Sequence, residues 1–178
     1  MSSIVGVGLC APSSVYRSLG FSVKSLGSIG NILRVKNMHL LLREPEPSYP
    51  RKTLLIQGSS DISLQNIDGL PTQVLTPESH CEEVATDSHA NHVVKAESLV
   101  IRSPDWARTK AAFESLGIKE LKARTDIYPG LRLSFFGAGA PDNRLILELV
   151  APEEPSVDAA DIPAKVWGVT WQVEDDLL

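Results

Sequence analysis

The hydrophobic and polar positions of residues 93–103 alternate in the way that predicts a β-strand. Successive side chains of an extended chain point to opposite sides, so every second residue shares a face. One face of this segment carries Leu99, Ile101 and Ser103, and the other carries Ser98, Val100 and Arg102. The first face suits a buried core, whereas the second presents hydrogen-bonding and charged groups.

An amphipathic helix is predicted directly after this strand, over residues 106–116. Asp105 is a typical N-cap residue, and Gly117 is a typical residue at a helix end. The buried face of the helix is formed at helical spacing by Ala112, Phe113 and Leu116. Further strands, separated by turns, are predicted at residues 121–128, 131–139 and 144–152. Residues 97–152 therefore predict a complete β-α-β-β-β unit.

Another alternating strand is predicted within residues 166–178, after an acidic linker at residues 153–165. Its form repeats that of the strand before Asp105, so we interpret it as the start of a truncated partner unit. The pattern puts Trp171 with Val169 and Val173 on a face expected to lie under a helix. The opposite face carries Thr170 and Gln172.

The N-terminal part of the chain has two competing interpretations. Residues 1–43 contain basic and serine residues but no Asp or Glu, which is typical of an organellar presequence. The same part also shows a helix that ends at Gly20 and an alternating strand after it, so we favour a degenerate folded unit over residues 1–45. Residues 46–96 are rich in turn-forming residues and predict a linker with at most two short strands, 52–57 and 72–75.

Composition excludes several classes of protein. The chain has 178 residues, 43% of them hydrophobic, which suits a globular fold. With 22 acidic and 17 basic residues it has a net charge of −5, and it lacks a basic stripe, so nucleic acid is not an expected partner. No apolar run approaches the ~20 residues of a membrane span. Two cysteines, Cys10 and Cys81, do not make a disulfide framework, and a cytoplasmic location is expected, with an organelle as the alternative.

Four segments together resemble the vicinal oxygen chelate superfamily, which includes glyoxalase I, extradiol dioxygenases and bleomycin-resistance proteins. The segments are "SLVIRSPDWARTKAAFESLGI", "LRLSFFGAG", "LILELVAP" and "VWGVTWQVEDD". The resemblance implies an α+β fold built from β-α-β-β-β modules, of which one is complete, one degenerate and one truncated. It also implies a cavity walled by curved sheets.

The superfamily resemblance further implies a divalent metal, held by a His on the first strand of a module and a Glu on the last. Glu148 matches the acidic position, but Ser98, Gly168 and approximately Gly6 stand at the histidine positions. A serine hydroxyl is a weak ligand for a divalent ion. We therefore expect no metal and no other cofactor, with a divalent metal as the alternative. Glu148 is expected to pair with Arg102, to contact a ligand or, least favoured, to bind metal.

A separate group of potential metal ligands lies in the segment "SHCEEVATDSHANH". It contains His80, Cys81, Glu82, His89 and His92. Zinc sites of proteins usually show paired spacings such as C-x2-C or H-x3-5-H, which are missing here. We interpret the segment as an exposed loop rather than a zinc site.

The sequence therefore favours a protein that binds a small molecule in a sheet-walled cavity without the usual metal. The candidate ligand-binding residues are Ser98, Arg102, Glu148, Thr170 and Gln172. The alternative is a metal-dependent lyase or dioxygenase of glyoxalase type that acts on a small oxygenated substrate. A cavity of this kind needs two modules, so the other half comes either from the degenerate N-terminal unit of the same chain or from a second copy in a homodimer. We favour a weakly self-associating protein and expect no membrane partner.

Overall fold

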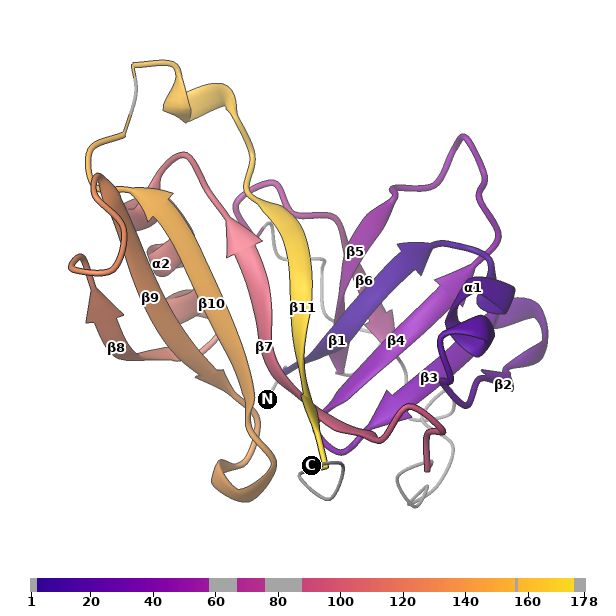
Figure 1. Cartoon of the computed structure of the whole chain (residues 1–178). Helices are drawn as coiled ribbons and strands as arrows, with labels where there is room; N and C mark the ends of the chain where they lie inside the picture. Colours follow the sequence, from indigo (N-terminus) through magenta and orange to yellow (C-terminus); the bar gives the residue numbers. More distant parts are fainter. Residues whose placement is uncertain (1–2, 58–66, 76–87, 156, 175–178) are drawn as a thin grey trace.

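The fold consists of two mixed β-sheets, each flanked by one α-helix (Figure 1). The computed structural model describes residues 3–57, 67–75, 88–155 and 157–174. Within these residues the chain is α+β, as the sequence predicts. No helix in the described ranges is long and apolar enough to cross a membrane.

The first sheet has six strands in the order β2-β3-β4-β1-β5-β6. The strands are β1 (Ser3–Cys10), β2 (Lys24–Ser25), β3 (Asn31–Val35), β4 (Met38–Arg43), β5 (Lys52–Gln57) and β6 (Thr72–Leu75). Helix α1 (Ser13–Ser18) follows β1, and a 3-10 turn (Gly27–Ile29) follows β2. The N-terminal residues that resembled a presequence in composition are thus built into a sheet.

The second sheet has five strands in the order β11-β7-β10-β9-β8. The strands are β7 (Val93–Arg102), β8 (Lys119–Arg124), β9 (Leu131–Ala138), β10 (Leu145–Pro152) and β11 (Lys165–Val173). Helix α2 (Trp106–Ser115) connects β7 to β8, and short 3-10 turns lie at Pro141–Asn143 and Ala159–Asp161.

Both sheets follow the same path of the chain. In each, a strand leads through a helix to three further strands, and the last of these pairs in parallel with the first: β4 with β1, and β10 with β7. In each, one more strand then pairs antiparallel with the other side of the first strand: β5 with β1, and β11 with β7. The strand predicted to open a separate unit, β11, is therefore the fifth strand of the second sheet.

The region predicted as a linker contributes directly to the first sheet. Both short strands expected there are confirmed as β5 and β6, and β5 carries the buried residues Leu54, Leu55 and Ile56. β5 lies inside the sheet, between β1 and β6, so this part of the region is a strand of the sheet as well as a connection. Turn-forming residues flank β5 and led to the linker interpretation, although the residues of β5 are strongly apolar.

The predicted helix after β7 is confirmed. The Asp105 side chain accepts a hydrogen bond from the Arg108 backbone N–H at 3.1 Å, and Gly117 takes a φ of 78° after the last turn. Phe113 is fully buried, and its ring centroid lies 5.2 Å from that of Phe136 on β9. The strand predicted at residues 121–128 lies earlier in the chain, because β8 begins at Lys119 and ends at Arg124, where the chain turns.

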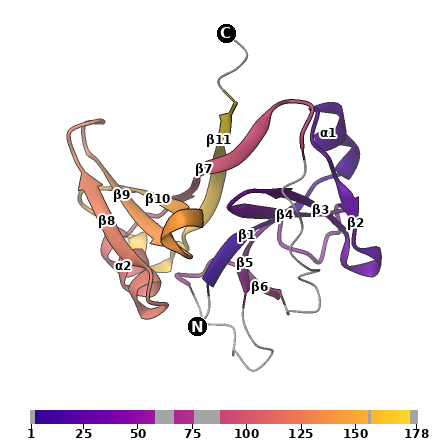
Figure 2. The ribbon, with the colours of Figure 1, turned by 90° about the horizontal axis from the view of Figure 1, so that it is seen from below.

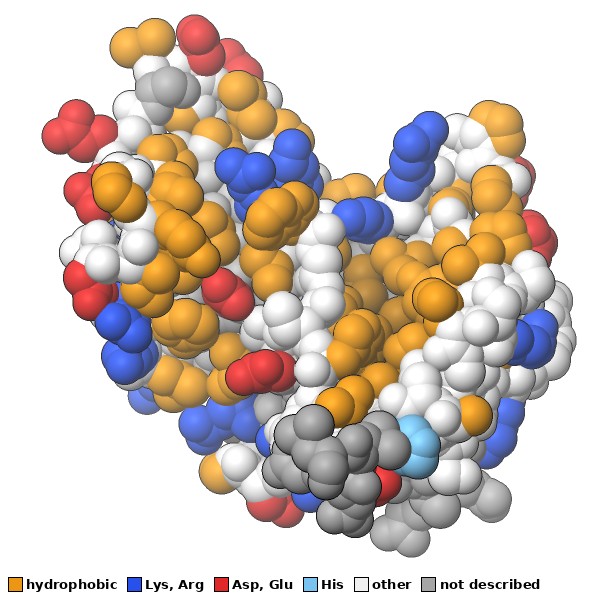
Figure 3. Space-filling model, in the orientation of Figure 1, with side chains coloured by type: hydrophobic (Ala, Val, Ile, Leu, Met, Phe, Trp, Pro, Cys, Tyr) orange, Lys and Arg blue, Asp and Glu red, His pale blue; other side chains and the backbone are white. Residues whose placement is uncertain are grey.

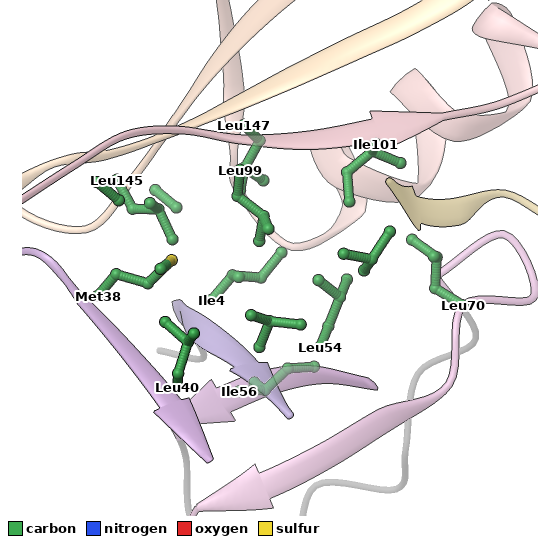
Figure 4. Close-up of a cluster of buried hydrophobic side chains, with 14 of the residues drawn as sticks. Ile4, Met38, Leu40, Leu54, Ile56, Leu70, Leu99, Ile101, Leu145 and Leu147 are labelled. Carbon is green, nitrogen blue, oxygen red and sulfur yellow. The ribbon is translucent and has the colours of Figure 1, made fainter. Parts of the chain in front are cut away.

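One hydrophobic core joins the two sheets. Leu99, Ile101, Leu145 and Leu147 of the second sheet point toward Ile4, Met38, Leu40, Leu54 and Ile56 of the first (Figure 4). Asn37 ties the sheets together beside this core, because its side chain bonds the backbone N–H and C=O of Ala96 and the C=O of Arg144. The two sheets lie side by side when the molecule is seen from below (Figure 2).

Candidate functional site

The face of the second sheet opposite α2, called the open face below, carries most of the residues that the sequence marked as candidates. Glu148 on β10 lies between Val100 on β7 and Phe135 on β9 in the strand pairing. Val100 is buried, whereas Phe135, Glu148 and the nearby Ile146 and Val150 are partly exposed. The result is an apolar sheet surface with one carboxylate at its centre.

Three polar side chains from neighbouring strands form a hydrogen-bonded row on the open face. The Ser98 hydroxyl donates to Glu148 Oε2 at 3.0 Å and lies 2.8 Å from Thr170 Oγ1. Thr170 Oγ1 also accepts the Ser98 backbone N–H at 2.9 Å. The row crosses β11, β7 and β10, and the strand pairing sets Ser98 opposite Thr170. The structure thus brings together three of the five candidate residues.

Arg102 lies on the same strand as Ser98, but it forms no ion pair with Glu148 within the described part of the chain. Its guanidinium carbon instead lies 5.2 Å from the ring centroid of Trp167. An ion pair between Arg102 and Glu148 was one of the sequence hypotheses, and the structure contradicts it. Trp167 is 57% exposed, so this cation–π pair lies at the solvent boundary of the open face.

Gln172 and Trp171 lie further along β11. Gln172 is exposed and pairs with Lys95, outside the row of Ser98, Glu148 and Thr170. Trp171 is partly buried and lies against Phe21, just after α1, with the ring centroids 5.4 Å apart. Trp171 therefore faces the first sheet rather than α2, a relationship that the strand pattern alone did not indicate.

The donors on the open face fit a divalent metal poorly. They comprise one carboxylate and two hydroxyls, whereas metals of the relevant kind are usually held by imidazole, thiolate or several carboxylates. Within the described ranges, no three His, Cys, Asp or Glu residues are grouped so that they could hold a metal ion. Gly168 stands at a position where the resemblance implies a histidine. It lies on β11 and pairs with Val100 of β7.

The histidine-rich segment has a structural role where it is described. His89 is buried: its Nδ1 accepts the Ser22 backbone N–H at 3.0 Å, and its Nε2 lies 2.9 Å from the Arg34 carbonyl oxygen. Both ring nitrogens are thus engaged with backbone groups, which leaves neither for a metal. His92 is exposed, with Nδ1 3.9 Å from a Glu174 oxygen. His80, Cys81 and Glu82 lie outside the described residues.

A buried polar cluster that the sequence did not reveal supports the end of this sheet. The Asp68 carboxylate, 3% exposed, accepts hydrogen bonds from Arg108 Nε and Thr109 Oγ1 on α2 and from Ser103. Arg108 also donates to the carbonyl oxygens of Ala159, Ala160 and Ile162. The cluster therefore holds the segment before β11 against α2, and with it the start of β11.

No model of a known protein family matches the chain, and no curated protein sequence matches it. Among solved structures, the chain is similar to a triple mutant of 4-hydroxymandelate synthase from Streptomyces coelicolor, with a TM-score of 0.58. The two sequences are 11% identical, and the alignment covers 98% of this chain and 72% of the synthase chain. An integron cassette protein from the mobile metagenome of V. Cholerae aligns over 83% of this chain and 91% of its own, at 11% identity, with a TM-score of only 0.25. The likeness to the synthase shows that the chain shares the fold of that protein, and the paired β-α-β-β-β path is the arrangement that the vicinal oxygen chelate resemblance implied.

Proposed function

We propose that the protein binds a small molecule on the open face of the second sheet, without the divalent metal of the superfamily. The ligand class is an apolar, preferably aromatic body that carries a hydroxyl or amine donor. Glu148 accepts the ligand's donor, and the apolar residues around it contact the ligand's body. Ser98 and Thr170 hold Glu148 in place, and Arg102 and Trp167 form the upper edge of the site.

The observation that carries this proposal is the position of the Glu148 carboxylate on an apolar surface. Within the described residues, the only side chain that donates a hydrogen bond to this carboxylate is Ser98, which bonds Oε2. A carboxylate has room for about four hydrogen bonds, so Glu148 retains acceptor capacity. Phe135, Ile146 and Val150 around it are partly exposed and supply the apolar contact that small-molecule sites usually have.

The probe for this proposal is 4-hydroxymandelate, the compound that appears in the name of the structurally similar synthase. Its phenol supplies a donor for Glu148, its ring an apolar body and its carboxylate a partner for Arg102. We expect chemical-shift changes in a 15N-labelled protein at residues of the open face. Glu148→Gln is expected to weaken binding about threefold or more, whereas the exposed Glu154→Gln serves as the control and leaves it unchanged. Equal binding of 4-hydroxymandelate by the native chain, Glu148→Gln and Glu154→Gln would contradict the role of Glu148.

The second candidate is a metal-dependent enzyme of glyoxalase or dioxygenase type, favoured by Glu148 at the acidic position on the last strand. Elemental analysis of protein purified without added metal separates the two proposals. We expect well under one equivalent of Zn, Ni, Mn or Fe, because one carboxylate and two hydroxyls are a weak donor set. Stoichiometric metal that disappears in Glu148→Gln, together with turnover of a glutathione hemithioacetal, would establish the enzyme instead.

The homodimer predicted from the sequence belongs to the same proposal. A second copy would cover the apolar residues of the open face and enclose the ligand. Light scattering on a sizing column measures the mass directly, and a dimer that dissociates in a Trp167→Glu variant would support pairing through this face. A monomer at all concentrations would leave the open face as the binding surface of a single chain.

A further inference from the structure

A cleft lies between the two sheets, on the opposite side of β11 from Thr170. Its lining residues come from β1, α1, β4 and β5 on one side and from β11 on the other. The cleft has a volume of about 440 Å³, within the range of small-molecule sites. Figure 3 shows hydrophobic side chains gathered in this hollow, with Lys and Arg side chains at its rim.

The floor and walls of the cleft are apolar. Val7, Leu9 and Leu40 of the first sheet form the floor. Val169 and Trp171 of β11 and Tyr16 of α1 also line the cleft. Leu9, Val169 and Trp171 are only partly buried, so apolar surface remains available to a ligand.

Two cations lie at the rim of the cleft. Lys52 Nζ donates to the carbonyl oxygens of Val166 at 3.2 Å and Trp167 at 2.9 Å, which fixes the ammonium group beside β11. An ammonium group has three donors, so one remains for a ligand. Arg51 is exposed beside it and has no ion-pair partner within the described ranges. The residues that line the cleft include no Asp or Glu, so the charge at its mouth is positive.

We propose that this cleft is a second binding site, for a small amphipathic anion with an apolar or aromatic body and one carboxylate. The body lies against Leu9, Val169 and Trp171, and the carboxylate is bound by Lys52 and Arg51. The phenol of Tyr16 is a further donor within the same cleft. A tyrosine phenol is protonated at neutral pH, and burial raises the pKa of Tyr16 further.

This site is independent of the open face. Val169 and Trp171 face the first sheet, whereas Thr170, between them in sequence, is hydrogen-bonded to Ser98 on the open face. A ligand in the cleft therefore contacts neither Glu148 nor Ser98. Occupancy of one site does not require the other, and the two proposals fail or succeed separately.

The test uses 2-naphthoate as the probe and 2-naphthylmethanol as its uncharged counterpart, measured by calorimetry on the full chain. We expect naphthoate to bind and the alcohol to bind at least about fivefold more weakly. Arg51→Ala is expected to weaken naphthoate binding about threefold, and Arg51→Ala with Lys52→Met about tenfold. Lys119→Ala, an exposed residue on β8, removes the same charge far from the cleft and is the control.

Cys10 lines the cleft and provides a second readout that does not depend on charge. In a Cys81→Ser variant, Cys10 is the remaining thiol, and iodoacetamide measures its exposure. We expect saturating naphthoate to slow alkylation about fivefold or more, and Leu9→Trp, which fills the cleft, to abolish this protection. Failure of naphthoate to bind, equal binding of the alcohol, or binding without protection of Cys10 would each overturn the proposal.

Discussion

The Ser98 hydroxyl donates a hydrogen bond to Glu148 Oε2 at 3.0 Å, across neighbouring parallel strands. Ser98 stands where the superfamily resemblance implies a histidine, and Glu148 stands where it implies a glutamate, so these two positions are in contact. Thr170, 2.8 Å from the same hydroxyl, extends the pair to the third strand.

The hydrogen bond between Ser98 and Glu148 should be measurable as a coupling energy. We expect Ser98→Ala to lower the free energy of unfolding by about 1 kcal/mol, because Ser98 is buried and its partners lose a donor. A double-mutant cycle with Glu148→Gln in urea should give a coupling of about 0.5–1 kcal/mol. Strictly additive effects would show that the two side chains do not interact in solution.

The Asp68 cluster should be the most sensitive polar site in the molecule. Asp68→Ala removes the partner of Arg108 and Thr109 and leaves the Arg108 charge without compensation, so we expect a loss of about 3–5 kcal/mol in urea unfolding. Asp68→Asn keeps the shape of the side chain, and asparagine tolerates the backbone φ of 52° at this position. We therefore expect a smaller loss of stability than for Asp68→Ala. Asp142→Ala, at an exposed turn, is the control. Equal stability of all three variants would be incompatible with the cluster.

Stability should fall in acid in part because of Glu120. Burial raises the pKa of Glu120, but hydrogen bonds from Lys110 and Ser134 outweigh this and lower the pKa below its usual value. A carboxyl with a lowered pKa in the folded state stabilises the fold above its unfolded pKa of ~4.3, and this contribution is lost as pH falls through the folded pKa.

The measurement compares Glu120→Gln with the native chain at two pH values. Glu120 Oε2 lies 2.5 Å from Lys110 Nζ, and we expect the variant to lose about 1 kcal/mol at pH 7. The difference should shrink in acid, as the pH falls through the lowered folded pKa and the native carboxyl takes up a proton. Glu114→Gln, whose oxygen is 3.6 Å from Lys110 and more exposed, should show a smaller loss. A difference that is constant with pH would exclude this ion pair as its cause.

The two glycines at histidine positions should respond oppositely to alanine. A Cβ at Gly6 would lie 1.9 Å from the His39 carbonyl oxygen, so Gly6→Ala should destabilise the fold by about 1–3 kcal/mol or more. A Cβ at Gly168 would meet nothing within 4 Å, and alanine there restricts the unfolded chain, so we expect a gain of about 0.5 kcal/mol. The measurement is the thermal unfolding of Gly6→Ala and Gly168→Ala beside the native chain. Similar effects of the two substitutions would contradict the backbone contact at Gly6.

The local elements could be predicted from neighbouring residues alone. Alternation defined β7 and β10, and the cap at Asp105 with the stop at Gly117 defined α2, because these signals arise from residues close together in the chain. The same alternation separated Ser98, Glu148 and Thr170 from the core face. Their joint presence on one face was therefore predictable once the order of the strands was supplied by the superfamily resemblance.

The tertiary structure alone decided which distant segments meet. The place of β5 between β1 and β6, the antiparallel pairing of β11 with β7, and the Asp68–Arg108 pair join residues from 18 to 80 positions apart. Strand propensity does not specify a partner, since every strand edge offers the same backbone groups. The cleft lined by Trp171 also depends on the tertiary structure, because its lining residues come from both sheets.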